Sequence, residues 1–115
     1  MLPEEKRKHP RIKCDFFAEL CEDENSTLGV GEIVDLSEGG AGIESTTPFV
    51  AGQKTLIRFS LPDGNETLVI VAEIVRTAEE KRSSVGKKFY GVRFTGALPE
   101  TIERIKSFLE KYKSL

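Results

Sequence analysis

The sequence predicts a mainly β protein: a small six-stranded antiparallel β-barrel of the split-barrel kind, with a C-terminal amphipathic α-helix and a flexible basic N-terminal arm. Three observations favour this class. Alternating apolar and polar residues recur in short runs separated by turn residues. The hydrophobic period lengthens to three or four residues only near the end of the chain. The length of 115 residues suits a single domain, which we divide into an arm (1–11), a barrel (12–95) and a helix (99–113).

The arm is strongly basic, although the whole chain carries a formal charge of −2. Lys6, Arg7, Lys8 and Arg11 lie close together, with no apolar residue among residues 6–11 to anchor them in a core. Such charges cannot bury themselves unaided, so we expect the arm to be flexible and to become ordered over a ligand. A basic start followed by acidic residues, within a chain of slightly negative net charge, does not favour a uniformly basic nucleic-acid-binding surface, and no nucleic-acid partner is expected.

The predicted barrel begins where the sequence starts to alternate. Ile12, Cys14, Phe16 and Leu20 share one face, with charged residues on the other, which predicts a half-buried strand. An acidic and polar stretch follows at residues 22–27, where we expect a solvated loop. Five further strands are expected at residues 31–36, 41–45, 55–61, 68–78 and 88–95.

Two turns between these strands depend on glycine. Gly39 and Gly40 are expected to supply the backbone freedom, including positive φ, for a tight turn or bulge between the second and third strands. The Pro-Asp-Gly-Asn sequence at residues 62–65 predicts a hairpin between the fourth and fifth strands, with Gly64 in the left-handed position.

The predicted helix starts with a proline and ends with lysines. Pro99 suits a first helical position, and Lys111 and Lys113 in the last turn complement the helix dipole. One apolar stripe is expected to pack on the sheet; its members are Ile102, Ile105, Phe108, Leu109 and Tyr112.

Cysteine usage and hydropathy predict a cytoplasmic protein. Cys14 and Cys21 are seven apart in one predicted strand, so they face opposite sides and no disulfide is expected. With only His9 beside them, they fall short of a zinc site, and we expect no metal and no cofactor beyond a ligand. No segment approaches the roughly 20 apolar residues of a membrane span, so no membrane insertion is expected.

The candidate binding residues form two groups. Arg7 and Arg11 are four residues apart, and their guanidinium forks suit phosphate or the O6/N7 edge of guanine. Asp35 can accept hydrogen bonds from guanine nitrogens, Ser37 is expected to share its strand face, and Gly40 lets backbone approach closely. No nucleophile lies beside an oriented base, so an enzyme is not expected.

Two motifs together carry a family resemblance. RKHPR at residues 7–11 matches R-x-x-x-R, and DLSEGG at residues 35–40 matches D/N-x-S-x-x-G. In this combination the chain resembles the PilZ domain family, bacterial receptors for the second messenger cyclic di-GMP. YGVRF at residues 90–94 also looks like the last barrel strand of that family, so the similarity spans nearly the whole chain.

The resemblance implies that cyclic di-GMP lies between the arm and the outer surface of the barrel. Arg7 and Arg11 would contact phosphates and guanine edges, while Asp35, Ser37 and Gly40 would form the reading surface on the barrel. Binding would change the conformation or the partner binding of a monomer or homodimer, with an unidentified protein downstream. The regulated process would be motility, biofilm formation or surface polysaccharide synthesis.

Two other functions stay open at this point. The barrel could be a ligand-independent adaptor of the same family, although members of that kind have lost the motifs. It could also bind single-stranded nucleic acid, but the aromatic pairs at residues 16–17 and 89–90 lie among too few positive charges.

Overall fold

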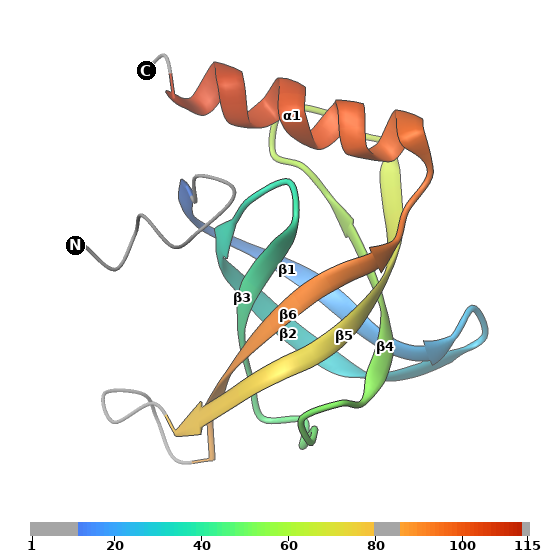
Figure 1. Ribbon diagram of the computed structural model, residues 1–115, viewed down its shortest axis with the longest axis vertical. Helices are drawn as coiled ribbons and strands as arrows, with labels where there is room; N and C mark the ends of the chain where they lie inside the picture. The colour runs from blue at the N-terminus through green and yellow to red at the C-terminus, as the bar shows by residue number, and fades with distance from the viewer. Residues whose placement is uncertain (1–11, 80–85, 114–115) are drawn as a thin grey trace.

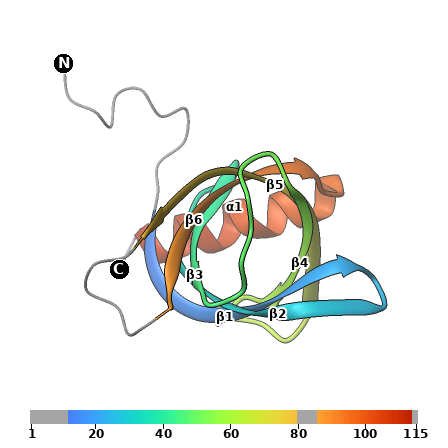
Figure 2. The same ribbon diagram turned by 90° about the horizontal axis from the view of Figure 1, so that it is seen from below.

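The computed structural model describes residues 12–79 and 86–113 and confirms the predicted fold class. All neighbouring strands are antiparallel, and the sheet closes in the order β1-β2-β3-β6-β5-β4. The helix α1 lies across one end of the barrel (Figure 1), and the closed ring is seen end-on in Figure 2. The predicted arm lies outside the described residues. The elements are β1 (Ile12–Asp23), β2 (Ser26–Leu36), β3 (Gly40–Ser45), β4 (Lys54–Ser60), β5 (Thr67–Glu79), β6 (Lys88–Gly96) and α1 (Pro99–Lys113).

The hairpin between β1 and β2 is longer than predicted, and the solvated loop expected at residues 22–27 is wrong. Asp23 still pairs with Ser26, so only Glu24 and Asn25 connect the strands. The carboxylate of Asp23 accepts a hydrogen bond of 2.8 Å from the backbone N–H of Asn25. Polar side chains at the exposed tip do not prevent strand pairing, because the ladder bonds are made by the backbone.

The core fills the inside of the barrel and carries few polar groups. Tyr90 is 1% exposed, and its hydroxyl donates to the carbonyl of Thr47 (3.0 Å) and accepts from the N–H of Phe49 (3.1 Å). This satisfies a phenol that would be costly to bury unpaired. The largest fully buried aliphatic side chains are Leu20, Ile33, Leu36, Ile43, Ile57, Ile70, Ile74 and Ile105.

The prediction that glycines at the two turns have positive φ is wrong. Among the described residues, Gly52 and Gly86 alone have positive φ, so Gly39, Gly40 and Gly64 do not. At Gly64 an added methyl group would lie 2.5 Å from a carboxylate oxygen of Glu66 and 2.7 Å from a guanidinium nitrogen of Arg104, both at the ends of flexible side chains that can move.

The barrel closes along a short seam between β1 and β4. Only three residue pairs join these strands, from Glu19 opposite Arg58 to Cys21 opposite Leu56. Two side chains of β4 reinforce the seam. The buried hydroxyl of Thr55 donates to the carbonyl of Cys21 (2.9 Å), and the guanidinium of Arg58 lies 3.5 Å from the carboxylate of Glu19. Cys21 remains a free thiol, as does Cys14.

Helix α1 closes one end of the barrel through the predicted apolar stripe. Ile105 is fully buried, and the ring of Phe108 meets Phe16 of β1 edge-on at 6.5 Å between centroids. Phe16 in turn packs against Phe59 of β4 at 5.7 Å. These contacts join the helix to both strands of the seam. At the end of the stripe, Tyr112 is 40% exposed.

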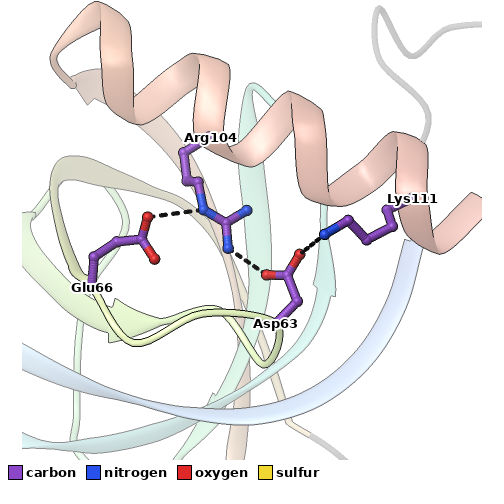
Figure 3. Close-up of polar contacts among 4 residues, drawn as sticks. All are labelled: Asp63, Glu66, Arg104 and Lys111. Carbon is purple, nitrogen blue, oxygen red and sulfur yellow. Dashed lines mark hydrogen bonds and ion pairs between the residues drawn. The ribbon is translucent and has the colours of Figure 1, made fainter.

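The same helix is held by ion pairs to the connection between β4 and β5 (Figure 3). Arg104 donates to the carboxylates of Asp63 and of Glu66, the latter at 3.0 Å, and Lys111 donates to Asp63 at 2.9 Å. The hydrogen bond from Arg104, and then that from Lys111, holds the pKa of Asp63 below its usual value. Lys111, which was expected only to complement the helix dipole, therefore also forms an ion pair with Asp63.

We predict that Thr55→Val lowers the free energy of unfolding by about 1–2 kcal/mol, because a buried carbonyl at the seam loses its donor. Thr95→Val is the matched control, since the exposed hydroxyl of Thr95 donates to the carbonyl of Val71 at 3.3 Å. It should change stability by less than about 0.5 kcal/mol. Urea unfolding measures both, and equal effects would contradict the importance of the seam bond.

We also predict that acid weakens the attachment of α1. A carboxyl whose pKa is lower in the folded than in the unfolded chain stabilises the fold above the unfolded value, and this stability disappears as pH falls through the folded value. For Asp63 this loss should begin near the ordinary pKa of 3.8 and continue below it. Asp63→Asn should therefore flatten the loss of stability between pH 5 and about pH 2. Glu22→Gln removes the same charge at the exposed end of β1 and is the control; an equal effect of both changes would contradict the prediction.

Candidate functional site

The turn between β2 and β3 is built around the buried side chain of Ser37. Its hydroxyl donates to the carbonyl of Gly40 (3.2 Å) and accepts from the N–H groups of Gly39 (3.3 Å) and Gly40 (3.1 Å). The backbone N–H of Ser37 also donates to the carbonyl of Gly40 (2.9 Å). Because a serine hydroxyl offers one donor and two acceptor sites, the turn occupies all of them.

Asp35 and Ser37 do not share a strand face, contrary to the prediction. β2 ends at Leu36, and Ser37 lies in the turn with 3% exposure. The strand also contains a bulge at Val34, since Ile33 pairs with Ile43 and Asp35 with Gly42. The extra residue puts both Ile33 and Leu36 into the core and turns Asp35 outward.

Gly40 is required by the close approach of β6. A methyl group added there would collide with the backbone carbonyl oxygen of Val92. The backbone N–H of Phe94 also donates to the carbonyl of Gly39 (2.9 Å), so the end of β6 holds the turn. The close approach predicted for Gly40 is therefore made by the protein's own backbone.

Asp35 lies against a second glycine and an aromatic ring. A methyl group on Gly42 would stand 2.7 Å from the Oδ2 atom of Asp35 and 2.8 Å from two ring carbons of Phe89. Gly42 thus leaves room for both groups on the outer surface. Lys13 of β1 is the cross-strand partner of Asp35 on the other side. The outer surface here offers a carboxylate and an aromatic ring, with Lys13 on the adjoining strand.

Cys14 is a half-buried thiol on β1 with three carboxylates nearby. Burial, followed by the charges of Asp35, Asp15 and Glu32, raises the pKa of the Cys14 thiol to about 12. The thiol is therefore neutral at physiological pH and behaves as a small packing group rather than as a nucleophile.

Helix α1 touches the turn directly. The amine of Lys106 lies 3.8 Å from the carboxylate of Glu38, which belongs to the D-x-S-x-x-G sequence. Lys106 is also 3.5 Å from Glu103, one turn earlier on the helix. The C-terminal helix and the candidate site are therefore joined by an ion pair that the sequence pattern did not indicate.

The structure brings together three of the five predicted site residues. Asp35, Ser37 and Gly40 lie in or beside one turn at the helix-covered end of the barrel, and Arg7 and Arg11 fall outside the described residues. Sequence reasoning missed Gly42, Phe89 and the Glu38–Lys106 pair. Strand register places the first two, and no local motif in the sequence encodes it.

The arrangement suits recognition by hydrogen bonding. In residues 12–79 and 86–113, no group of three or more His, Cys, Asp or Glu side chains could hold a metal ion. The outward carboxylate can accept hydrogen bonds from the N–H groups of a flat heterocycle, and the aromatic ring beside it can stack against that heterocycle.

Within the described part of the chain, no helix has the length and apolarity needed to cross a membrane.

Solved structures with a similar fold include several bacterial proteins. The PilZ domain of YcgR from Escherichia coli with c-di-GMP matches with a TM-score of 0.75 and 19% identity, over 95% of this chain and 92% of that one. Bacillus subtilis MotI/DgrA, an inhibitor of motility, matches with a TM-score of 0.77 and 11% identity, over 94% of this chain and 51% of that one. The K. pneumonia MrkH–c-di-GMP complex matches with a TM-score of 0.72 and 17% identity, over 90% and 51%.

The chain thus spans about half the length of MotI/DgrA and MrkH. At these identities the structural matches concern the fold. Comparison of the sequence with curated proteins gave no match. The family model of the PilZ domain matches residues 5–111, which include both motifs and nearly all of the barrel and helix. The chain therefore belongs to the PilZ domain family.

Proposed function

We propose that this domain is a receptor for cyclic di-GMP. The observation that carries the proposal is the complete D-x-S-x-x-G turn, held rigid by Ser37 and Gly40, with Asp35 directed outward beside it. Membership of the PilZ family supports the choice of ligand, as do the similar PilZ domain of YcgR and the MrkH complex, which contain c-di-GMP.

Some residues of the proposed site contact the ligand, and others hold the turn in place. Asp35 accepts hydrogen bonds from the N–H groups of a guanine base, and Arg7 and Arg11 bind phosphates or the guanine O6/N7 edge. Ser37 and Gly40 belong to the same site, where they fix the turn that presents Asp35. The protein is a binding module and catalyses no reaction.

Ligand binding changes a surface of the domain that a partner protein recognises. We propose that the domain acts on a downstream protein, as a monomer or a homodimer, and that motility, biofilm formation or surface polysaccharide is the process affected. A domain without detectable affinity for the nucleotide would instead fit a ligand-independent adaptor.

The arginines provide the first test. A charge-assisted hydrogen bond contributes about 1.5–3 kcal/mol, so Arg11→Ala and Arg7→Ala should each weaken cyclic di-GMP binding by roughly ten- to a hundredfold. Arg11→Lys should restore only part of the affinity, because an ammonium lacks the fork. Titration calorimetry measures these affinities, with GTP as the control ligand and Lys54→Ala, on the exposed start of β4, as the control variant. Wild-type affinity in both alanine variants would remove the arginines from the site.

The two glycines provide the second test because their neighbours differ. The atoms nearest to a methyl group at Gly42 belong to the side chains of Asp35 and Phe89, which can shift, so Gly42→Ala should fold and bind about tenfold more weakly. At Gly40 the obstacle is the backbone of Val92, so Gly40→Ala should lose about 1–3 kcal/mol of stability. Circular dichroism with urea measures folding, and calorimetry measures binding. Unchanged affinity in a folded Gly42→Ala would contradict the placement of Asp35 in the site.

A further inference from the structure

An outward-facing row of residues crosses four strands of the barrel beside the turn. Asp35 on β2 pairs with Gly42 on β3, Gly42 pairs with Gly91 on β6, and Gly91 pairs with Arg76 on β5. Cross-strand partners share a face of the sheet. This is the outer face, because Tyr90, the neighbour of Gly91, is buried inside. The two middle residues of the row are glycines, so the row has no side chain between Asp35 and Arg76.

Both charged side chains lean over the glycines. The Nε atom of Arg76 is 3.6 Å from the position that a methyl group on Gly91 would take. The carboxylate of Asp35 covers Gly42 in the same way. The strand spacing of about 4.8 Å separates the ends of the row by roughly 14 Å at the backbone, so the inward lean brings the two charged groups much closer than that.

An aromatic ring connects the two charges. The guanidinium carbon of Arg76 lies 5.5 Å from the centroid of Phe89, which is a cation–π distance. The same ring reaches Gly42, where the Asp35 carboxylate also lies. Arg76 is exposed, and it forms no ion pair with any residue in 12–79 or 86–113. Among the described residues, its guanidinium is thus positioned by the cation–π contact with Phe89 and by no ionic partner.

We propose that Arg76, supported by Phe89, is a further ligand-binding residue that selects guanine over adenine. A guanine placed over this surface presents O6 and N7 as two acceptors to the Arg76 fork. Adenine presents N7 and an amino group there, so one N–H of the fork would face a donor. This inference rests on the proposed function and names the residue that sets its base specificity.

The test is titration of the wild-type chain, Arg76→Ala and Arg76→Lys with cyclic di-GMP and cyclic di-AMP. A bidentate contact of this kind contributes roughly 5- to 150-fold in discrimination, so Arg76→Ala should lose cyclic di-GMP affinity and guanine preference by that factor. Arg76→Lys should keep part of the affinity but little of the preference. Lys54→Ala controls for the loss of one positive charge on a neighbouring strand. Circular dichroism of each variant confirms the fold.

Each outcome separates this inference from the proposed function. If the wild-type chain binds cyclic di-GMP and Arg76→Ala binds it equally well, the role of Arg76 is overturned and the receptor function stands. If Arg76→Ala weakens both dinucleotides by the same factor, Arg76 binds phosphate and the selection of guanine is overturned. If the wild-type chain binds neither, the receptor function fails, and the role of Arg76 fails with it.

Discussion

Closure of the barrel between β1 and β4 is the contact on which the other features depend. It consists of three residue pairs, reinforced by the hydroxyl of Thr55 and the guanidinium of Arg58. β1 also carries Phe16, on which α1 docks, and Lys13, which pairs with Asp35. A displaced β1 would therefore disturb the helix and the candidate site together, although neither contributes a residue to the seam.

Within the site, rigidity and recognition are assigned to different residues of one short motif. Ser37 and Gly40 use their hydrogen bonds and their lack of bulk inside the protein, against the turn and against β6. Asp35 is turned outward by the bulge that precedes it. A motif of six residues thus contains its own support, because its serine and glycine hold the turn beside an outward-facing acid.

The sequence predicted the barrel, the helix and the apolar faces of the first strand and of the helix, because strand alternation and the helical stripe are local signals. The register of the strands is not local, and the main errors follow from that. β2 ends at Leu36 and the turn buries Ser37, which separates its side chain from that of Asp35, and cross-strand pairing shortened the loop expected at residues 22–27 to Glu24 and Asn25. Gly42, Gly91 and Arg76 lie far apart in sequence, so their alignment in one row emerges only after the sheet closes.

The ion pair between Glu38 and Lys106 has a thermodynamic consequence. It joins the turn to the helix that covers one end of the barrel. Linkage between two sites is reciprocal: a ligand that changes the affinity of α1 for a partner by some factor has its own affinity changed by the same factor when that partner binds. A partner on α1 and a ligand at the turn, if coupled through this pair, would each shift the concentration at which the other binds.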